Sequence, residues 1–113
     1  MSTIFEVLAE PTRRDILDLL RQRPHLVGEL VEQLKLSQPL VSKHLRVLRE
    51  AGLVEVRQDA QRRWYELRFE PLIELDTWLT AYRQLWEARF DRLDDYLQAL
   101  QEEKKDDTDN QDE

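Results

Sequence analysis

The chain contains no cysteine, only two glycines and four prolines, and no long apolar run among its 113 residues. The lack of cysteine excludes disulfides, thiolate metal sites, iron–sulfur clusters and thiol nucleophiles. The scarcity of glycine and proline leaves few turns, which indicates a mainly helical chain. No run approaches the roughly 18 apolar residues of a membrane span, and the N-terminus lacks the basic-then-apolar order of a secretion signal. We therefore expect one domain, or one domain with a tail, in the cytoplasm and without a membrane partner.

Catalytic motifs are also missing from the sequence. It has no glycine-rich phosphate loop and no serine nucleophile elbow. Its two histidines, His25 and His44, are too few for an imidazole-rich metal site within one chain. We expect no enzymatic activity and no cofactor.

The net charge of −7 is unevenly distributed along the chain. Residues 101–113 carry seven acidic and two basic side chains, and residues 71–100 carry six acidic and three basic ones. In residues 35–68 the balance is reversed, with eight basic and four acidic side chains. Because salt screens charges over roughly 8–10 Å, a ligand docked on that segment responds to its local positive excess. The acidic total therefore does not exclude a polyanionic partner.

Apolar spacing predicts three short helices in the first third of the chain. The first covers residues 4–9 and stops near Pro11. The second has Thr12 as its expected N-cap and ends before Pro24. The third covers residues 27–34, where apolar residues recur at i, i+3, i+4 and i+7.

Ser37 is the strongest helix-start signal in the sequence. It is a favoured N-cap residue, and Pro39 follows in the first turn, where a missing N–H costs no internal hydrogen bond. This helix is expected over residues 38–51, with Gly52 as the left-handed residue that closes it. The residues expected on its buried side are Leu40, Val41, Leu45 and Leu48.

The apolar period then changes to two, which is typical of β-strands. Val54 and Val56 alternate with charged residues, and a second alternating run extends from Tyr65 to Phe69. Residues 58–62 form the connecting turn. The pattern predicts a two-stranded hairpin with a polar tip.

A long helix is predicted from Pro71 to about Gln101. At 1.5 Å per residue it is about 45 Å long, more than a domain of this size covers. Its apolar face is either an intramolecular core face or the interface of a homodimer, and we favour the dimer, with residues 4–9 alongside. The apolar row consists of Leu72, Leu75, Leu79, Tyr82, Trp86, Phe90, Leu93, Leu97 and Leu100. The residues expected in the dimer interface are Phe5, Leu75, Trp78, Leu79, Tyr82, Trp86, Phe90, Leu93 and Leu97.

The chain thus divides into residues 1–70, the helix 71–101 packed on the same domain, and residues 102–113. The last segment has no apolar residue and is expected to be a disordered acidic tail. A competitive mimic of DNA phosphates is the alternative interpretation of this tail.

The predicted elements are a helix, a short turn, a capped helix and a hairpin. This order is typical of a winged helix-turn-helix. We therefore expect a mainly α fold with a β-hairpin wing that dimerises through its long C-terminal helix. In this fold the second helix enters a DNA major groove about 12 Å wide, so its outer face must be polar. The DNA-binding residues expected here are Ser37, Gln38, Ser42, Lys43, His44 and Arg46. For His44, a structural role inside the domain is an equal alternative.

Residues 36–54, LSQPLVSKHLRVLREAGLV, closely resemble the recognition-helix motif of the ArsR/SmtB family of bacterial winged-helix transcription regulators. The resemblance extends through LAEPTRRDILDLL (8–20) and RRWYELRF (62–69) and covers about residues 4–100. The last helix looks like that of a cysteine-free branch of the family, rich in Trp and Arg. The resemblance implies a homodimeric DNA-binding repressor with residues 37–46 in the DNA-reading helix.

The hairpin would then be the wing, with Arg57, Arg62 and Arg63 beside the minor groove or the DNA backbone. The family commonly has a glycine at the tip, where this chain has DAQ (59–61). Asp59 also opposes phosphate. A backbone-only contact of the wing is therefore as plausible as insertion into the groove.

The chain departs from the metal-sensing members of the family. These carry Cys-x-Cys just before the Asp/Glu-Leu pair of the helix-turn-helix, where this chain has Leu26, Val27 and Gly28 before Glu29. The last helix has carboxylates but no histidine. We expect no regulatory transition-metal site. What relieves repression stays open: it could be a small apolar ligand held by Trp78, Tyr82 and Trp86, a partner protein, or a change in the abundance of the protein. Aromatic residues at this spacing are more often core residues than a ligand site.

The sequence therefore predicts a sequence-specific repressor that binds an inverted repeat in double-stranded DNA as a homodimer. The alternative is a winged-helix module that has lost DNA binding and offers its acidic surface to a basic protein partner. The basic residues that count against this alternative are Lys43, Arg46, Arg49, Arg62 and Arg63.

Overall fold

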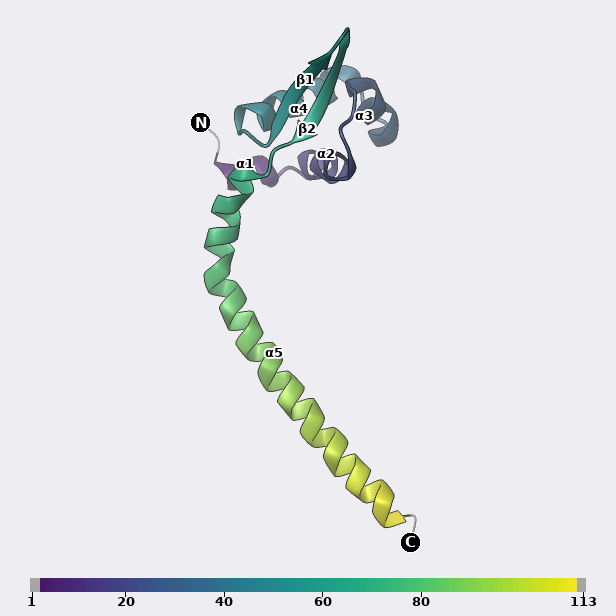
Figure 1. The fold of residues 1–113 in the computed structure, drawn as a ribbon, viewed down its shortest axis with the longest axis vertical. Helices are drawn as coiled ribbons and strands as arrows, with labels where there is room; N and C mark the ends of the chain where they lie inside the picture. Colours follow the sequence, from purple (N-terminus) through teal and green to yellow (C-terminus); the bar gives the residue numbers. More distant parts are fainter. Residues whose placement is uncertain (1–2, 112–113) are drawn as a thin grey trace. The chain divides into compact units, whose positions relative to one another are not determined.

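A computed structural model describes the backbone of residues 3–111 and the side chains of residues 3–104. The elements are α1 (Ile4–Leu8), α2 (Pro11–Gln22), α3 (Val27–Leu34), α4 (Gln38–Glu50), β1 (Val54–Asp59), β2 (Arg62–Leu67) and α5 (Glu70–Gln111) (Figure 1). The predicted fold class is confirmed, because five helices and one antiparallel hairpin follow each other in the expected order. The chain divides into two units, Met1–Asp76 and Thr77–Glu113.

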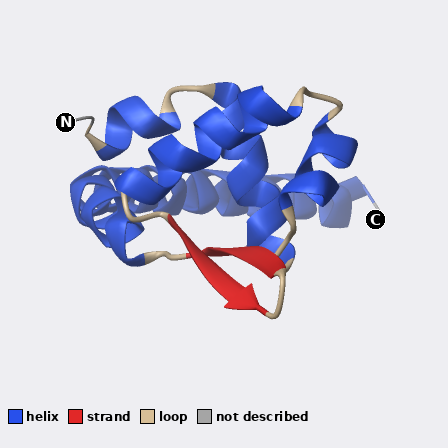
Figure 2. Cartoon of the chain, turned by 90° about the horizontal axis from the view of Figure 1, so that it is seen from above, coloured by secondary structure: helices blue, strands red, loops and turns tan. Residues whose placement is uncertain are grey.

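The first unit has one apolar core, to which α1 to α4 and β1 all contribute. The hairpin of β1 and β2 projects from the helices of this unit (Figures 1 and 2). The buried apolar side chains are Ile4, Val7, Ile16, Leu20, Leu30, Val41, Leu45, Leu48, Leu53 and Val54. Burying side chains of this size stabilises the fold by roughly 1.5–3 kcal/mol each. The core therefore fixes α4 and the hairpin on the same small domain.

The ends of α4 are set by local signals that the sequence predicts correctly. The Ser37 hydroxyl accepts a hydrogen bond from the backbone N–H of Leu40 (3.4 Å), and Pro39 lies in the first turn. Gly52 follows the helix with φ of +78°, a left-handed conformation that glycine adopts without a Cβ penalty. The helix predicted over residues 27–34 is likewise confirmed as α3.

Two details of the predicted helices are wrong. Helix α2 begins at Pro11, with Glu10 as its N-cap, and Thr12 already lies inside it. The fixed φ of proline suits the first helical position, so Pro11 starts a helix instead of only ending one. Leu40, predicted to be buried, is 38% exposed, whereas Val41, Leu45 and Leu48 are buried as predicted.

The hairpin is tighter than predicted. Its strands pair from Val54 with Leu67 to Asp59 with Arg62, so only Ala60 and Gln61 form the turn. The predicted second strand ended at Phe69, but β2 ends at Leu67 and Phe69 is exposed. The Phe69 carbonyl instead accepts a hydrogen bond from the backbone N–H of Leu72 (2.9 Å) at the start of α5.

Side-chain and backbone contacts hold the outer elements of the first unit in place. Arg13 Nε donates to the Val7 carbonyl (2.7 Å), and Arg14 Nη1 donates to the Leu8 carbonyl (2.7 Å). These two arginines of α2 satisfy carbonyl oxygens at the end of α1, which a helix of this length leaves unpaired. His25 and Tyr65 exchange two backbone hydrogen bonds (3.0 and 2.8 Å), which attach β2 to the α2–α3 connection.

The second unit consists of the larger part of α5. The backbone stays helical to Gln111, so the helix does not end near Gln101 as the apolar spacing predicted. The predicted acidic tail at residues 102–113 falls mostly on side chains outside the described part, and its disorder and its role remain predictions. Among the described residues, no helix is both long enough and apolar enough to span a membrane.

Candidate nucleic-acid interface

The outer face of α4 carries the polar residues that the sequence assigned to DNA binding. Gln38, Ser42, Lys43 and Arg46 are all exposed. Residues four apart on a helix lie on the same face, so Gln38, Ser42 and Arg46 form one row along α4. Ser37 is exposed at the start of the helix, where its hydroxyl caps the first turn.

Three adjoining surface depressions follow this row. The first, of about 450 Å³, lies between α4 and the wing and is lined by Gln38, Ser42, Arg62 and Arg63, among others. The second, of about 410 Å³, is lined by Pro39, Ser42, Lys43 and Arg46. Because Ser42 lines both, the structure brings Arg62 and Arg63 of the wing onto one surface with these α4 residues, whereas Arg57 lines none of the three depressions. We refer to the residues that line these two depressions as the α4–wing surface.

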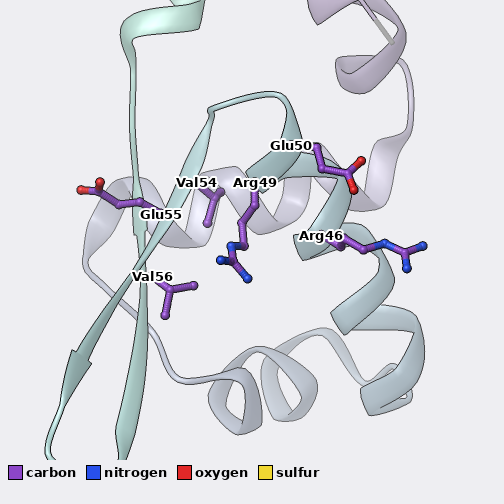
Figure 3. Close-up of a pocket in the computed structure, with 6 residues that line it drawn as sticks. All are labelled: Arg46, Arg49, Glu50, Val54, Glu55 and Val56. Carbon is purple, nitrogen blue, oxygen red and sulfur yellow. The ribbon is translucent and has the colours of Figure 1, made fainter. Parts of the chain in front are cut away.

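The third depression, of about 550 Å³, extends this surface past Arg46 toward the end of α4. Its lining includes Arg49, Val54 and Val56, and Figure 3 shows the Arg49 side chain reaching between α4 and β1. Sequence reasoning left Arg49 out of the candidate set. Its spacing of three residues from Arg46, on the same helix face, is the signal that identifies it.

The three wing arginines have different surroundings. Arg57 Nε donates to Glu66 Oε1 (2.6 Å), and this hydrogen bond raises the pKa of the Arg57 guanidinium. Arg62 pairs with Asp59 in the strand register. Since both Arg57 and Arg62 have an acidic residue nearby, the wing offers less net positive charge than its arginines alone suggest.

His44 lies on the buried side of α4, with 9% of its surface exposed. Burial lowers the pKa of His44, and the charge of Arg13 lowers it further. The charge of Glu10 has a smaller effect that raises this pKa, and the charge of Lys43 has a smaller effect that lowers it. Its Nδ1 atom has no hydrogen-bond partner among the described residues. This burial favours the structural role of His44, which the sequence left open beside DNA contact.

The sequence pattern of α4 contained the signal for this correction. Val41, His44, Leu45 and Leu48 follow the i, i+3, i+4, i+7 spacing of a buried helix face. Leu40 does not fit this spacing, and His44 does, which agrees with their exposure.

The residues predicted for a dimer interface carry large exposed apolar side chains. Phe5 on α1 is exposed, and Leu75 and Leu79 on α5 are half-buried. The remaining predicted interface residues on α5 are all exposed: Trp78, Tyr82, Trp86, Phe90, Leu93 and Leu97.

No cluster of three or more metal-ligating side chains exists within the described residues. The two cysteines of the Cys-x-Cys motif would fall on Leu26 and Gly28 of this chain, and Leu26 lines the depression beside the wing. Neither residue has a side chain that can ligate a metal ion.

Helix α4 is capped, has a polar and cationic outer face, and packs against α3, and the β-hairpin flanks it. This arrangement defines a winged helix-turn-helix protein. The family model for the bacterial regulatory proteins of the arsR family matches residues 10–56, from the start of α2 into β1. The chain belongs to the ArsR family.

The alignments with two relatives include most of the chain. The transcriptional repressor SdpR of Bacillus subtilis is 32% identical over 82 residues, which are 73% of this chain and 91% of SdpR. The HTH-type transcriptional regulator Rv2034 of Mycobacterium tuberculosis is 41% identical over 95 residues, covering 77% of this chain and 89% of Rv2034.

Among solved structures, the homodimeric winged helix-turn-helix DNA-binding domain of Mb0332 from Mycobacterium bovis has a TM-score of 0.56. It is 28% identical to this chain and covers 69% of it, and the match covers 72% of the Mb0332 chain. The Mb0332 domain is a possible ArsR-family regulator.

Proposed function

We propose that this protein is a homodimeric transcriptional repressor that binds an inverted repeat in double-stranded DNA without a metal cofactor. The observation that carries the proposal is the α4–wing surface, where polar and cationic residues of α4 and of β2 line adjoining depressions. A protein that binds DNA in this way would act in the cytoplasm.

Residues near the start of α4 are suited to base recognition. In a winged helix-turn-helix the N-terminal part of this helix meets the edges of the bases in the major groove. Gln38 offers an amide that can pair with adenine, and Ser42 offers a hydroxyl that accepts or donates. Lys43 and Arg46 lie further along the exposed face and supply positive charge to the phosphates.

The wing supplies the second set of contacts. Arg62 and Arg63 line the same depression as Gln38 and Ser42, so they would contact DNA next to the groove that holds α4. Arg57 remains in the proposed set, with its charge partly balanced by Glu66. A wing with this mixed charge fits contact with the backbone better than deep insertion into the minor groove.

The exposed apolar face of α5 supports a homodimer, and the exposed Phe5 of α1 belongs to the same proposal. The M. bovis relative is homodimeric. Two-fold symmetry would present two copies of α4 to successive major grooves, about 34 Å apart. Because SdpR is a repressor, we propose that binding occludes a promoter.

The central test measures binding to a random-sequence duplex by fluorescence anisotropy at two salt concentrations. Affinity should fall steeply with salt because phosphate contacts release counterions. Arg46→Ala should weaken binding and flatten this salt dependence by about two units of slope, one for each copy of Arg46 in the dimer. Arg21→Ala, which removes one exposed positive charge from α2 outside all three depressions, is the matched control and should have little effect.

Genome-wide footprinting would then supply the operator for a test of specificity. Gln38→Ala should relax the base preference at one operator position at a cost of about 1–3 kcal/mol. Lys43→Ala should instead weaken binding to all sequences equally. An absence of duplex binding at low salt would refute the proposal and favour a protein-interaction module.

A further inference from the structure

Lysine is rare in this chain, which has thirteen arginines and four lysines. Among the described residues that line the three depressions, Lys43 is the one lysine, and the other cations are Arg46, Arg49, Arg62 and Arg63. The two kinds of side chain differ in chemistry, because acylation removes the charge of an amine, whereas a guanidinium stays charged. Lys43 is therefore the point on this surface where a covalent modification of the amine can remove positive charge.

The amine of Lys43 is accessible. The side chain is exposed on the outer face of α4, and within residues 3–104 no ion pair joins it to a carboxylate. The depression of about 410 Å³ that Lys43 lines is also lined by Pro39, Ser42 and Arg46. One small open depression thus has an amine, a hydroxyl and a guanidinium on its walls.

The hydroxyl of Ser42 and the guanidinium of Arg46 suit a phosphate group. A guanidinium donates two parallel hydrogen bonds to phosphate oxygens, and a hydroxyl donates one more. Arg46 follows Lys43 by three residues, so the two side chains are neighbours on the helix surface. Figure 3 shows the Arg46 side chain extending away from the hairpin. A phosphate group bound by Arg46 and Ser42 would therefore lie beside the Lys43 amine.

We propose that Lys43 is an acylation site and that its acyl donor is a small acyl phosphate. Ser42 and Arg46 bind the phosphate group of the donor and bring its acyl carbon to the Lys43 amine. The neutral amine attacks the carbonyl carbon and forms a C–N bond. The C–O bond to the phosphate breaks, and inorganic phosphate leaves with the bonding electrons and takes up the proton that the nitrogen releases.

The product is an uncharged amide on the helix that is proposed to enter the major groove. The inference rests on the proposed function and adds a way of regulating it, because acylation removes one phosphate contact from each copy of α4. Bound DNA covers Lys43 in the proposed complex. Acylation therefore acts on the DNA-free protein and keeps it off the operator.

The side chains around Lys43 are the reason to choose an acyl phosphate as the donor. Its phosphate is bonded directly to the reacting acyl group, so Arg46 and Ser42 bind the leaving group itself. A thioester donor has a neutral sulfur at that position, which offers nothing to a guanidinium.

Acetyl phosphate is the probe, and Lys35 in the same chain is the internal reference. Lys35 is also exposed, but it lines none of the three depressions. The full chain is treated with acetyl phosphate in the absence of DNA, and peptide mass spectrometry follows acetylation at each lysine. Lys43 should be acetylated several-fold faster than Lys35, because a cationic site concentrates an anionic reagent.

Two controls test whether the anion-binding side chains cause this preference. Arg46→Ala should abolish the preference and leave the rate at Lys35 unchanged, whereas Arg21→Ala, a matched loss of charge on α2, should keep it. Acetic anhydride, an uncharged acetyl donor, should show no preference for Lys43. Equal rates at the two lysines with acetyl phosphate, or the same preference with acetic anhydride, would overturn the inference.

DNA binding separates the inference from the proposed function. In fluorescence anisotropy with a random duplex, acetylated wild type should bind more weakly, with a salt dependence flattened by about two units, one for each copy of Lys43. Lys43→Arg should have the same affinity before and after treatment. Unchanged affinity of protein acetylated at Lys43 would overturn the regulatory role. A failure of the untreated protein to bind DNA would overturn the proposed function and the regulation together, whereas selective acetylation of Lys43 would still support the acylation site.

Discussion

Arg13 holds α1 onto the domain through Val7. The Arg13 guanidinium donates from Nε to the Val7 carbonyl oxygen (2.7 Å) and from Nη2 to the Glu6 carbonyl oxygen (3.3 Å). One arginine therefore satisfies two backbone acceptors in α1, which has only five residues. A helix this short is not stable alone, so its position depends on such tertiary contacts.

Arg13→Ala should therefore destabilise the protein. The expected loss in the free energy of unfolding is about 1.5–3 kcal/mol, the usual value of hydrogen bonds that involve a charged group. Urea unfolding at one fixed protein concentration measures it, because dimerisation couples stability to concentration. Arg13→Lys keeps the charge but loses the forked geometry and should recover only part of the loss. An unchanged unfolding midpoint for Arg13→Ala would contradict this role.

Ala60 at the tip of the wing has a positive φ of 56°. An alanine pays for this left-handed conformation because its Cβ approaches the neighbouring carbonyl oxygen, and glycine does not. Ala60→Gly should raise the free energy of unfolding by up to about 1 kcal/mol. The matched control is Ala88→Gly in α5, which should lower it by about 1 kcal/mol because glycine is unfavourable inside a helix. Destabilisation by both substitutions would show that Ala60 is not strained.

The buried His44 should make stability depend on pH. Its pKa is lowered from the reference value of 6.5 in the folded protein, chiefly by burial, so the unfolded chain takes up the proton more readily. The stabilising contribution is complete above pH 6.5 and decreases as the pH falls below it, with a slope of at most about 1.4 kcal/mol per pH unit.

Comparing wild type with His44→Gln isolates this contribution from other titrating groups. Urea unfolding from about pH 7.5 to about pH 5.5 should show a steeper loss of stability for wild type than for the variant. Parallel profiles would mean that His44 does not carry the effect.

The Arg57–Glu66 pair should limit the contribution of the wing to DNA binding. Glu66→Gln removes the negative charge and leaves the Arg57 guanidinium available for phosphate. Binding to random duplex should become stronger by up to about fivefold, because an exposed ion pair no longer competes with phosphate for the guanidinium. Fluorescence anisotropy at low salt measures this change. In the Arg57→Ala background the gain should be much smaller, and an equal gain there would show that Glu66 acts by general repulsion of DNA.

Most of the α4–wing surface could be predicted from local sequence. Ser37, Pro39 and Gly52 fix where α4 starts and ends, because caps and φ preferences act over a few residues. The change of apolar period after Gly52 identified the hairpin in the same way. What the local patterns could not give was the partner of each charged residue.

Two residues of α4 show what the polarity of a residue alone does not decide. His44 is buried and Leu40 is exposed, the reverse of what their polarity suggests. The side of α4 that faces α2 and α3 is decided by how the helices pack, and His44 lies on the buried side. The spacing of Arg49 from Arg46 is visible in the sequence, and only the place of Arg49 beside β1 depends on the chain folding back after Gly52.

The sequence by itself determined the order of the helices and strands, the caps of α4, and the apolar row of α5. Each of these depends on neighbours within a few residues or on a period along one helix. Only the tertiary structure decided that Arg13 anchors α1, that His25 pairs with Tyr65, and that Glu66 balances Arg57. These contacts join residues that are distant along the chain or on different strands, and packing of the common core brings them together.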